Sequence, residues 1–90
     1  MKTIEGFRMR KLGNEHIIVG EGLSQVNFNK MIALNESAAL LWGAFEGGKE
    51  FTVDQLADLL VEEYGIERGL ALKDSADIAS KWIEAGIVSE

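Results

Sequence analysis

Residues 28–45, with the sequence FNKMIALNESAALLWGAF, contain the point where the chain changes from strand-like to helix-like patterning. Phe28 to Leu34 predicts a short β-strand, and its last four residues are apolar on both faces. Asn35 then offers a side-chain oxygen to the free amides of a helix, and Glu36 in the first turn suits the helix dipole. We therefore expect a strand that runs directly into a helix at this junction.

The helix after Asn35 carries a single apolar stripe. Its members follow the spacing i, i+3, i+4 and i+7, and they are Ala38, Leu41, Trp42 and Phe45. The pair Gly47-Gly48 ends the pattern. We expect Trp42 to be a core residue whose burial contributes roughly 2–4 kcal/mol.

A second helix is predicted to begin at Thr52. Thr52 and Gln55 have the spacing of a capping box, and Gly65 stands where a left-handed residue ends a helix. The inner face of this helix is expected to consist of Val53, Leu56, Ala57, Leu60 and Tyr64.

A third helix is predicted from near Glu67 to Ala85, with Gly86-Ile87 as a Schellman-like ending. Its expected buried side consists of Leu72, Ser75, Ala76, Ala79, Trp82 and Ile83. The small residues beside Trp82 either let another element approach closely or leave a groove, and the pattern alone does not choose between the two.

The residues before Phe28 predict two further strands. Phe7–Arg10 alternates apolar and basic residues, and His16–Val19 is a β-branched run. Turns are expected at Gly13-Asn14 and at Ser24-Gln25. The order of three strands followed by three helices indicates an α+β fold, in which a three-stranded antiparallel sheet packs on a helical bundle. We expect residues 1–90 to form a single domain.

Composition limits the classes of partner. The chain has 90 residues, a net charge of −6 and no cysteine. An acidic surface repels phosphate backbones, so we do not expect nucleic acid as a partner. The sequence contains no apolar run long enough for a membrane span and no cysteine for a disulfide, so we expect no membrane association and a cytoplasmic location.

No pattern in the sequence predicts catalysis, a metal site or a cofactor. His16 is the single histidine, and no other ligand type clusters around it. The neighbours Glu62 and Glu63 point in different directions on a helix, while Asp74 and Asp77 are typical of a solvated helix face. We therefore expect a protein that is not an enzyme and that holds neither metal nor cofactor.

An ordered set of residues from Met31 to Val88 resembles the PqqD-like family, named for a small protein of pyrroloquinoline quinone synthesis. The set starts with Leu34-Asn35, an alanine at 38 or 39, and Trp42. It continues with Thr52-Val53, Leu56-Ala57, Leu60, Glu63-Tyr64-Gly65-Ile66, Asp74 and Glu84-Ala85-Gly86-Ile87-Val88. Together these residues cover about two-thirds of the chain, and their order is more specific than any single piece.

The resemblance implies a winged-helix-like domain called a RiPP recognition element, where RiPP denotes a ribosomally made and post-translationally modified peptide. In such a domain a leader peptide joins the sheet as an extra strand between the third strand and the third helix. Carried over to this chain, the peptide-binding residues are Lys30, Met31, Ile32, Ala33, Asp74, Ile78 and Lys81. The first four would pair through their backbone, and the last three would set side-chain preference. Ser75 and Ala79 depart from the family pattern, in which larger aliphatic residues are more usual.

The resemblance also implies two partners, a precursor leader peptide and a modifying enzyme of the radical S-adenosylmethionine type. Two alternatives stay open. A winged-helix protein that binds nucleic acid or has a regulatory role would need a basic third helix, but Arg68, Lys73 and Lys81 are outnumbered there by acidic residues. A structural dimerisation domain would instead pair the third strand with its own copy, giving a homodimer through an edge strand.

Overall fold

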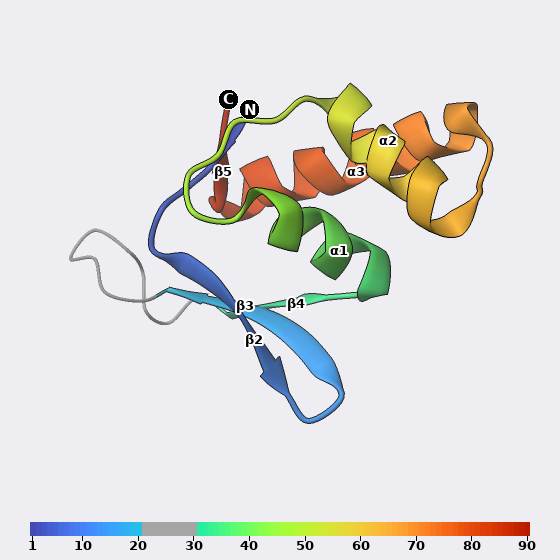
Figure 1. The fold of residues 1–90 in the computed structure, drawn as a ribbon. Helices are drawn as coiled ribbons and strands as arrows, with labels where there is room; N and C mark the ends of the chain where they lie inside the picture. The colour runs from blue at the N-terminus through green and yellow to red at the C-terminus, as the bar shows by residue number, and fades with distance from the viewer. Residues whose placement is uncertain (21–30) are drawn as a thin grey trace.

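The computed structural model describes residues 1–20 and 31–90. Its elements are β1 (Lys2–Thr3), β2 (Phe7–Leu12), β3 (Glu15–Gly20), β4 (Met31–Leu34), α1 (Glu36–Phe45), α2 (Val53–Tyr64), α3 (Arg68–Ala85) and β5 (Val88–Ser89). In the view of Figure 1 the three-stranded sheet lies at the bottom and the three helices lie above it. The predicted α+β fold is confirmed. The predicted turn at Ser24-Gln25 and the first part of the third strand, residues 28–30, lie outside the described residues.

The main sheet is antiparallel, with the strand order β2-β3-β4. β2 and β3 form a hairpin in which Leu12 pairs with Glu15, so the turn consists of Gly13 and Asn14, as expected. Gly13 has a φ of 63°, a left-handed conformation that glycine adopts without strain. Each of these strands is longer than the pattern predicted, because the hairpin continues the pairing up to the turn.

The helix boundaries follow the capping residues. The side chain of Asn35 accepts a hydrogen bond from the amide of Ala38, so β4 passes into α1 within one residue. Thr52 and Gln55 form both hydrogen bonds of the capping box at the start of α2. At the end of α3 the amide of Gly86 donates to Ile83 and that of Ile87 to Trp82, which completes the Schellman motif.

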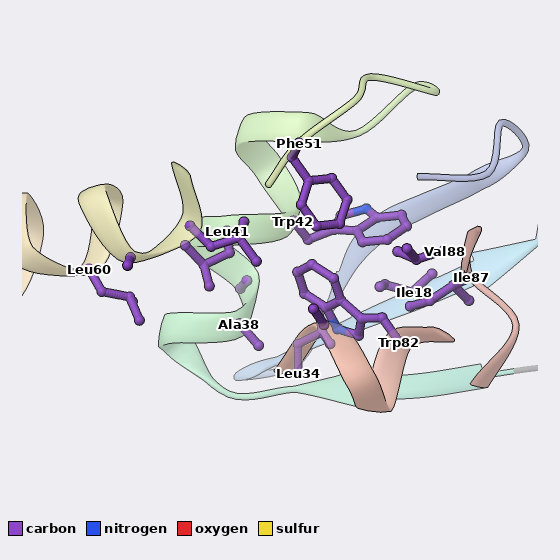
Figure 2. Packing of buried hydrophobic residues seen from close by; sticks show 14 of the residues in the cluster. Ile18, Leu34, Ala38, Leu41, Trp42, Phe51, Leu60, Trp82, Ile87 and Val88 are labelled. Atoms are coloured by element: carbon purple, nitrogen blue, oxygen red, sulfur yellow. The ribbon is translucent and has the colours of Figure 1, made fainter. Parts of the chain in front are cut away.

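Two tryptophans from different helices meet at the centre of the core (Figure 2). Trp42 of α1 is fully buried and Trp82 of α3 is 3% exposed. Their ring centroids are 5.4 Å apart at an interplanar angle of 87°, the edge-to-face geometry that aromatic pairs favour. Phe51 packs edge-on against Trp82 from the loop before α2, at a centroid distance of 6.2 Å. Both tryptophans are therefore core residues, as the helical stripes predicted.

Two residues assigned to inner helix faces lie elsewhere. Tyr64 is 45% exposed, because it occupies the last turn of α2, where the helix ends at Gly65. Ala76 is exposed, since the buried face of α3 consists of Ala71, Ser75, Ala79 and Trp82. Three of these four residues were predicted, and the prediction missed Ala71. The centre of the buried face therefore lies roughly 50° from the predicted one.

A second sheet joins the two ends of the chain and was not predicted. β1 pairs with β5 in antiparallel register, with Lys2 opposite Ser89 and Thr3 opposite Val88 (Figure 1). The buried hydroxyl of Thr3 donates to the carbonyl of Phe45 at 2.6 Å and accepts from the amide of Gly48 at 3.0 Å. These two hydrogen bonds of Thr3 join the loop after α1 to β1. We call the paired strands β1 and β5 the β1–β5 clasp.

Candidate functional site

A groove of about 200 Å³ lies between β4 and α3. Ile32, Ala33 and Leu34 form its strand wall. Its helix wall is formed by Ile78, Lys81 and Ala85, which follow one another at the three- and four-residue spacing of a single helix flank. We call this hollow the β4–α3 groove.

The base of the β4–α3 groove is part of the core. Ala38 and Trp82 line it, and both are almost fully buried. Ile32 and Ile78 above them are half-buried, whereas Ala33 and Lys81 are exposed. An incoming side chain would therefore contact an apolar surface that the core holds rigid, and the rim would contribute a single cationic group from Lys81.

The strand wall of this groove is also an edge of the sheet. Among the described strands, β4 pairs with β3 alone. The amide of Met9 in β2 donates to Oε1 of Glu46 at 2.6 Å, so the backbone of Met9 faces away from β3. Because Met9 pairs with Ile18 and Ile18 pairs with Ile32, the alternation of an antiparallel ladder turns the backbone of Ile32 toward β3. The backbone groups of Ala33 therefore face the open edge.

The structure brings four of the seven predicted site residues together. Ile32, Ala33, Ile78 and Lys81 all line the β4–α3 groove. Asp74 does not, because it lies one turn of α3 before Ile78, in a neighbouring depression. Two predicted residues come from the start of the strand: the backbone of Met31 forms the first residue of β4, and Lys30 lies outside the described residues.

The neighbouring depression has a larger volume, about 550 Å³, and continues from the groove. Its lining contains Asn35, which also lines the β4–α3 groove, so the two hollows meet at the start of α1. The other lining residues come from three helices and the loop before α3, and they are Glu36, Ser37, Leu60, Tyr64, Ile66 and Asp74. We call this hollow the Asn35 depression.

Sequence reasoning missed several residues that line these hollows. Asn35 was recognised only as a cap and Ala38 only as a core residue, although both face the β4–α3 groove. Ala85 continues the spacing of Ile78 and Lys81, so a search along that helix flank would have found it. Ser75 lines neither hollow. Its hydroxyl is fully buried, and no hydrogen-bond partner for it is found among the described residues.

In residues 1–20 and 31–90, no group of three or more histidine, aspartate or glutamate side chains is placed to hold a metal ion. Across the same residues, no helix is both long and apolar enough to cross a membrane.

An ion pair joins α3 to α2. Arg68 of α3 donates a hydrogen bond to Asp58 of α2, and this bond raises the pKa of the Arg68 guanidinium.

Comparison with known proteins adds a family and a related structure. Residues 15–88 match the sequence model of the family described as coenzyme PQQ synthesis protein D (PqqD). One similar solved structure is TbiB1 in complex with the TbiA(beta) leader peptide, with a TM-score of 0.71 and 14% sequence identity over the whole of both chains. At that identity the likeness concerns the fold. No curated protein sequence matches the chain.

Proposed function

Because this chain belongs to the PqqD family, we propose that it is a recognition domain for the leader segment of a ribosomal precursor peptide. The observation that carries this proposal is the position of the β4–α3 groove directly beside an open strand edge. An extended peptide needs both features, since the edge offers backbone hydrogen bonds and the groove offers pockets for alternate side chains. The related fold of TbiB1, which was determined with a leader peptide, supports the same reading.

In the proposed complex the leader forms a strand next to β4. The outward backbone of Ala33, with that of Met31 two residues earlier, pairs with the peptide, and Lys30 at the start of the proposed strand stays a proposed binding residue outside the described residues. Apolar side chains of the peptide pack on Ile32 and Ile78. Lys81 at the rim of the groove and Asp74 in the Asn35 depression set the preference for charged positions. The seven residues named from the sequence thus remain the proposed binding residues.

The energetics of this arrangement favour moderate affinity. A peptide strand of five or six residues gains about 4–6 backbone hydrogen bonds, each of net ~0.5–1.5 kcal/mol, and buries one or two side chains. Ordering a flexible leader costs ~2–5 kcal/mol. We expect micromolar to sub-micromolar dissociation constants, equivalent to roughly −7 to −9 kcal/mol.

The proposed role is delivery without catalysis. A bound leader raises the effective concentration of the precursor at a modifying enzyme carried on another chain, and family analogy suggests a radical S-adenosylmethionine enzyme. We expect residues 1–90 to act as one domain. The encounter is proposed to occur in the cytoplasm, where precursor peptides are synthesised.

Calorimetric titration with leader segments of short precursor peptides encoded beside this chain tests the proposal. We expect one leader to bind with a micromolar or lower dissociation constant, and a scrambled peptide of the same composition to bind at least about 30-fold more weakly. Failure of every neighbouring leader to bind at concentrations up to about 1 mM would contradict the proposed function.

A further inference from the structure

The Asn35 depression extends the path that a peptide strand would follow along β4. It shares Asn35 with the β4–α3 groove, and its far wall is formed by the end of α2 and the start of α3. The start of α1 and the end of α2 lie at the same side of the molecule (Figure 1). A peptide strand longer than the groove would therefore place its next side chains over this depression.

The lining of the depression combines apolar and acidic groups. Leu60 is buried and Ile66 is half-buried, while Tyr64 is 45% exposed. Glu36 and Asp74 supply two carboxylates, and no lysine or arginine is among the lining residues that the structure describes. Arg68, a nearby cation at the start of α3, is held by Asp58 and lies 3.7 Å from Asp54.

These features suit the side chain of lysine or arginine. Such a side chain has a long apolar stem, which would pack on Leu60 and Ile66, and a cationic head, which would reach the carboxylates. The exposed face of Tyr64 adds a cation–π contact. A purely apolar side chain would leave the carboxylates without partners, and an acidic one would be repelled by them.

We propose that the Asn35 depression is a second specificity pocket, in which Glu36, Tyr64 and Asp74 bind a basic side chain of the leader peptide. The proposal rests on the function proposed above and defines the class of peptide that is recognised. The charge of the pocket is opposite to that of the groove rim, where Lys81 is the charged residue.

The spacing of α3 sets the position of the basic residue in the peptide. Asp74 and Ile78 are four residues apart, which corresponds to about 6 Å along a helix. Two residues of a β-strand span about 6.6 Å, and side chains two positions apart point to the same face. We therefore expect the basic residue to stand two positions from the apolar residue that packs on Ile78, giving the pattern apolar-x-basic in one chain direction.

Selection from a displayed library of random 12-residue peptides tests this inference without knowledge of the natural leader. The chain is compared with the double variant Glu36→Gln/Asp74→Asn. The matched control is Asp77→Asn/Glu84→Gln, which makes the same change of net charge on exposed residues outside both hollows. Circular dichroism checks that all three proteins are folded, and the peptides selected by the unaltered chain are then measured against each.

The expected result is enrichment of peptides in which a basic residue stands two positions from an apolar one. A selected peptide should bind the double variant about tenfold more weakly, because two partly exposed ion pairs are lost, and should bind the control within about twofold. Replacing its basic residue by norleucine should weaken binding to the unaltered chain and abolish the difference between the chains, a readout that does not depend on how the variant folds.

Two other results are distinguishable. Peptides that share apolar positions but show no basic preference, or that bind the double variant and the control equally, would overturn the second pocket and leave leader recognition in place. Absence of any enriched peptide with the unaltered chain would overturn both proposals.

Discussion

The two edges of the main sheet are built differently. At the β2 edge the side chains of Arg8, Arg10 and Lys11 are exposed. Oε1 of Glu46 accepts from the outward amide of Met9 at 2.6 Å, and Oε2 of Glu46 lies 3.8 Å from the Arg8 guanidinium. Charged side chains and an occupied amide are the features by which natural sheets prevent pairing with another chain.

Among the residues that the structure describes, the β4 edge lacks both of these features. Its four residues, Met31–Leu34, carry no charge, and Ala33 faces outward with the smallest side chain on the strand. The β4–α3 groove lies directly beside it. The contrast teaches that, in its described residues, the sheet is protected against strand addition at β2 and unprotected at β4, which is the edge where we propose that an extended peptide binds.

Proline placed on the two edges should give the largest difference. Ala33→Pro removes an outward amide and sets a ring against the incoming strand, so we expect leader affinity to fall at least about 100-fold while the domain stays folded. Lys11→Pro is the matched control on β2, because Lys11 follows Met9 by two residues and its amide also faces outward. Calorimetry should show that the Lys11→Pro variant keeps its affinity for the leader. Equal losses of leader affinity in the two variants would show that the two edges are equivalent.

Removing the Glu46 carboxylate, which occupies the outward amide of Met9 at the β2 edge, should have a smaller effect. This effect is on the stability of the fold. Glu46→Ala leaves the amide of Met9 and the indole Nε1 of buried Trp42 without their acceptor, which lies at 3.0 Å from Nε1. We expect the free energy of unfolding to fall by about 2 kcal/mol in urea titrations. Light scattering should also detect self-association that rises with concentration, because the second edge is now free.

Glu46→Gln serves as the control for that variant, since its amide oxygen can still accept both hydrogen bonds. It should recover most of the lost stability and associate no more than the unaltered chain does. Full stability and no added self-association in Glu46→Ala would mean that Glu46 does not protect the β2 edge.

Truncating the groove wall should give the smallest effect. Ile78→Ala removes part of the surface on which a peptide side chain packs, so we expect leader binding to weaken about threefold to tenfold. Ile83→Ala, also half-buried on α3 but outside the groove, is the matched control. Similar losses in calorimetric titrations of the two variants would argue against the β4–α3 groove as the binding surface.

The parts of the fold that the sequence predicted are those with local causes. Asn35, the Thr52–Gln55 box and Gly65 each define a helix end through bonds to residues a few positions away. The β1–β5 clasp was missed because its strands have two residues each and Lys2 pairs with Ser89 at the other end of the chain. Two residues are too few to show an alternating pattern.

The site shows the same division between local and long-range causes. Ile78 and Lys81 were named through the resemblance to the PqqD-like family, which places the peptide beside the third helix, and helical spacing puts the two residues on one flank of α3. The role of Glu46 could not, because its bond to Met9 joins residues 37 positions apart and depends on how α1 packs on β2. The Asn35 depression likewise exists only where three helices converge.

Amide hydrogen exchange measured by NMR, with and without a saturating leader peptide, tests strand addition at β4 most directly. The amide of Ile32, which faces β3, should be protected in both states, whereas the amide of Ala33 should become protected only in the complex. Exchange along β2 should not change. Protection that appears on β2, or an Ala33 amide that still exchanges freely in the saturated complex, would contradict the account.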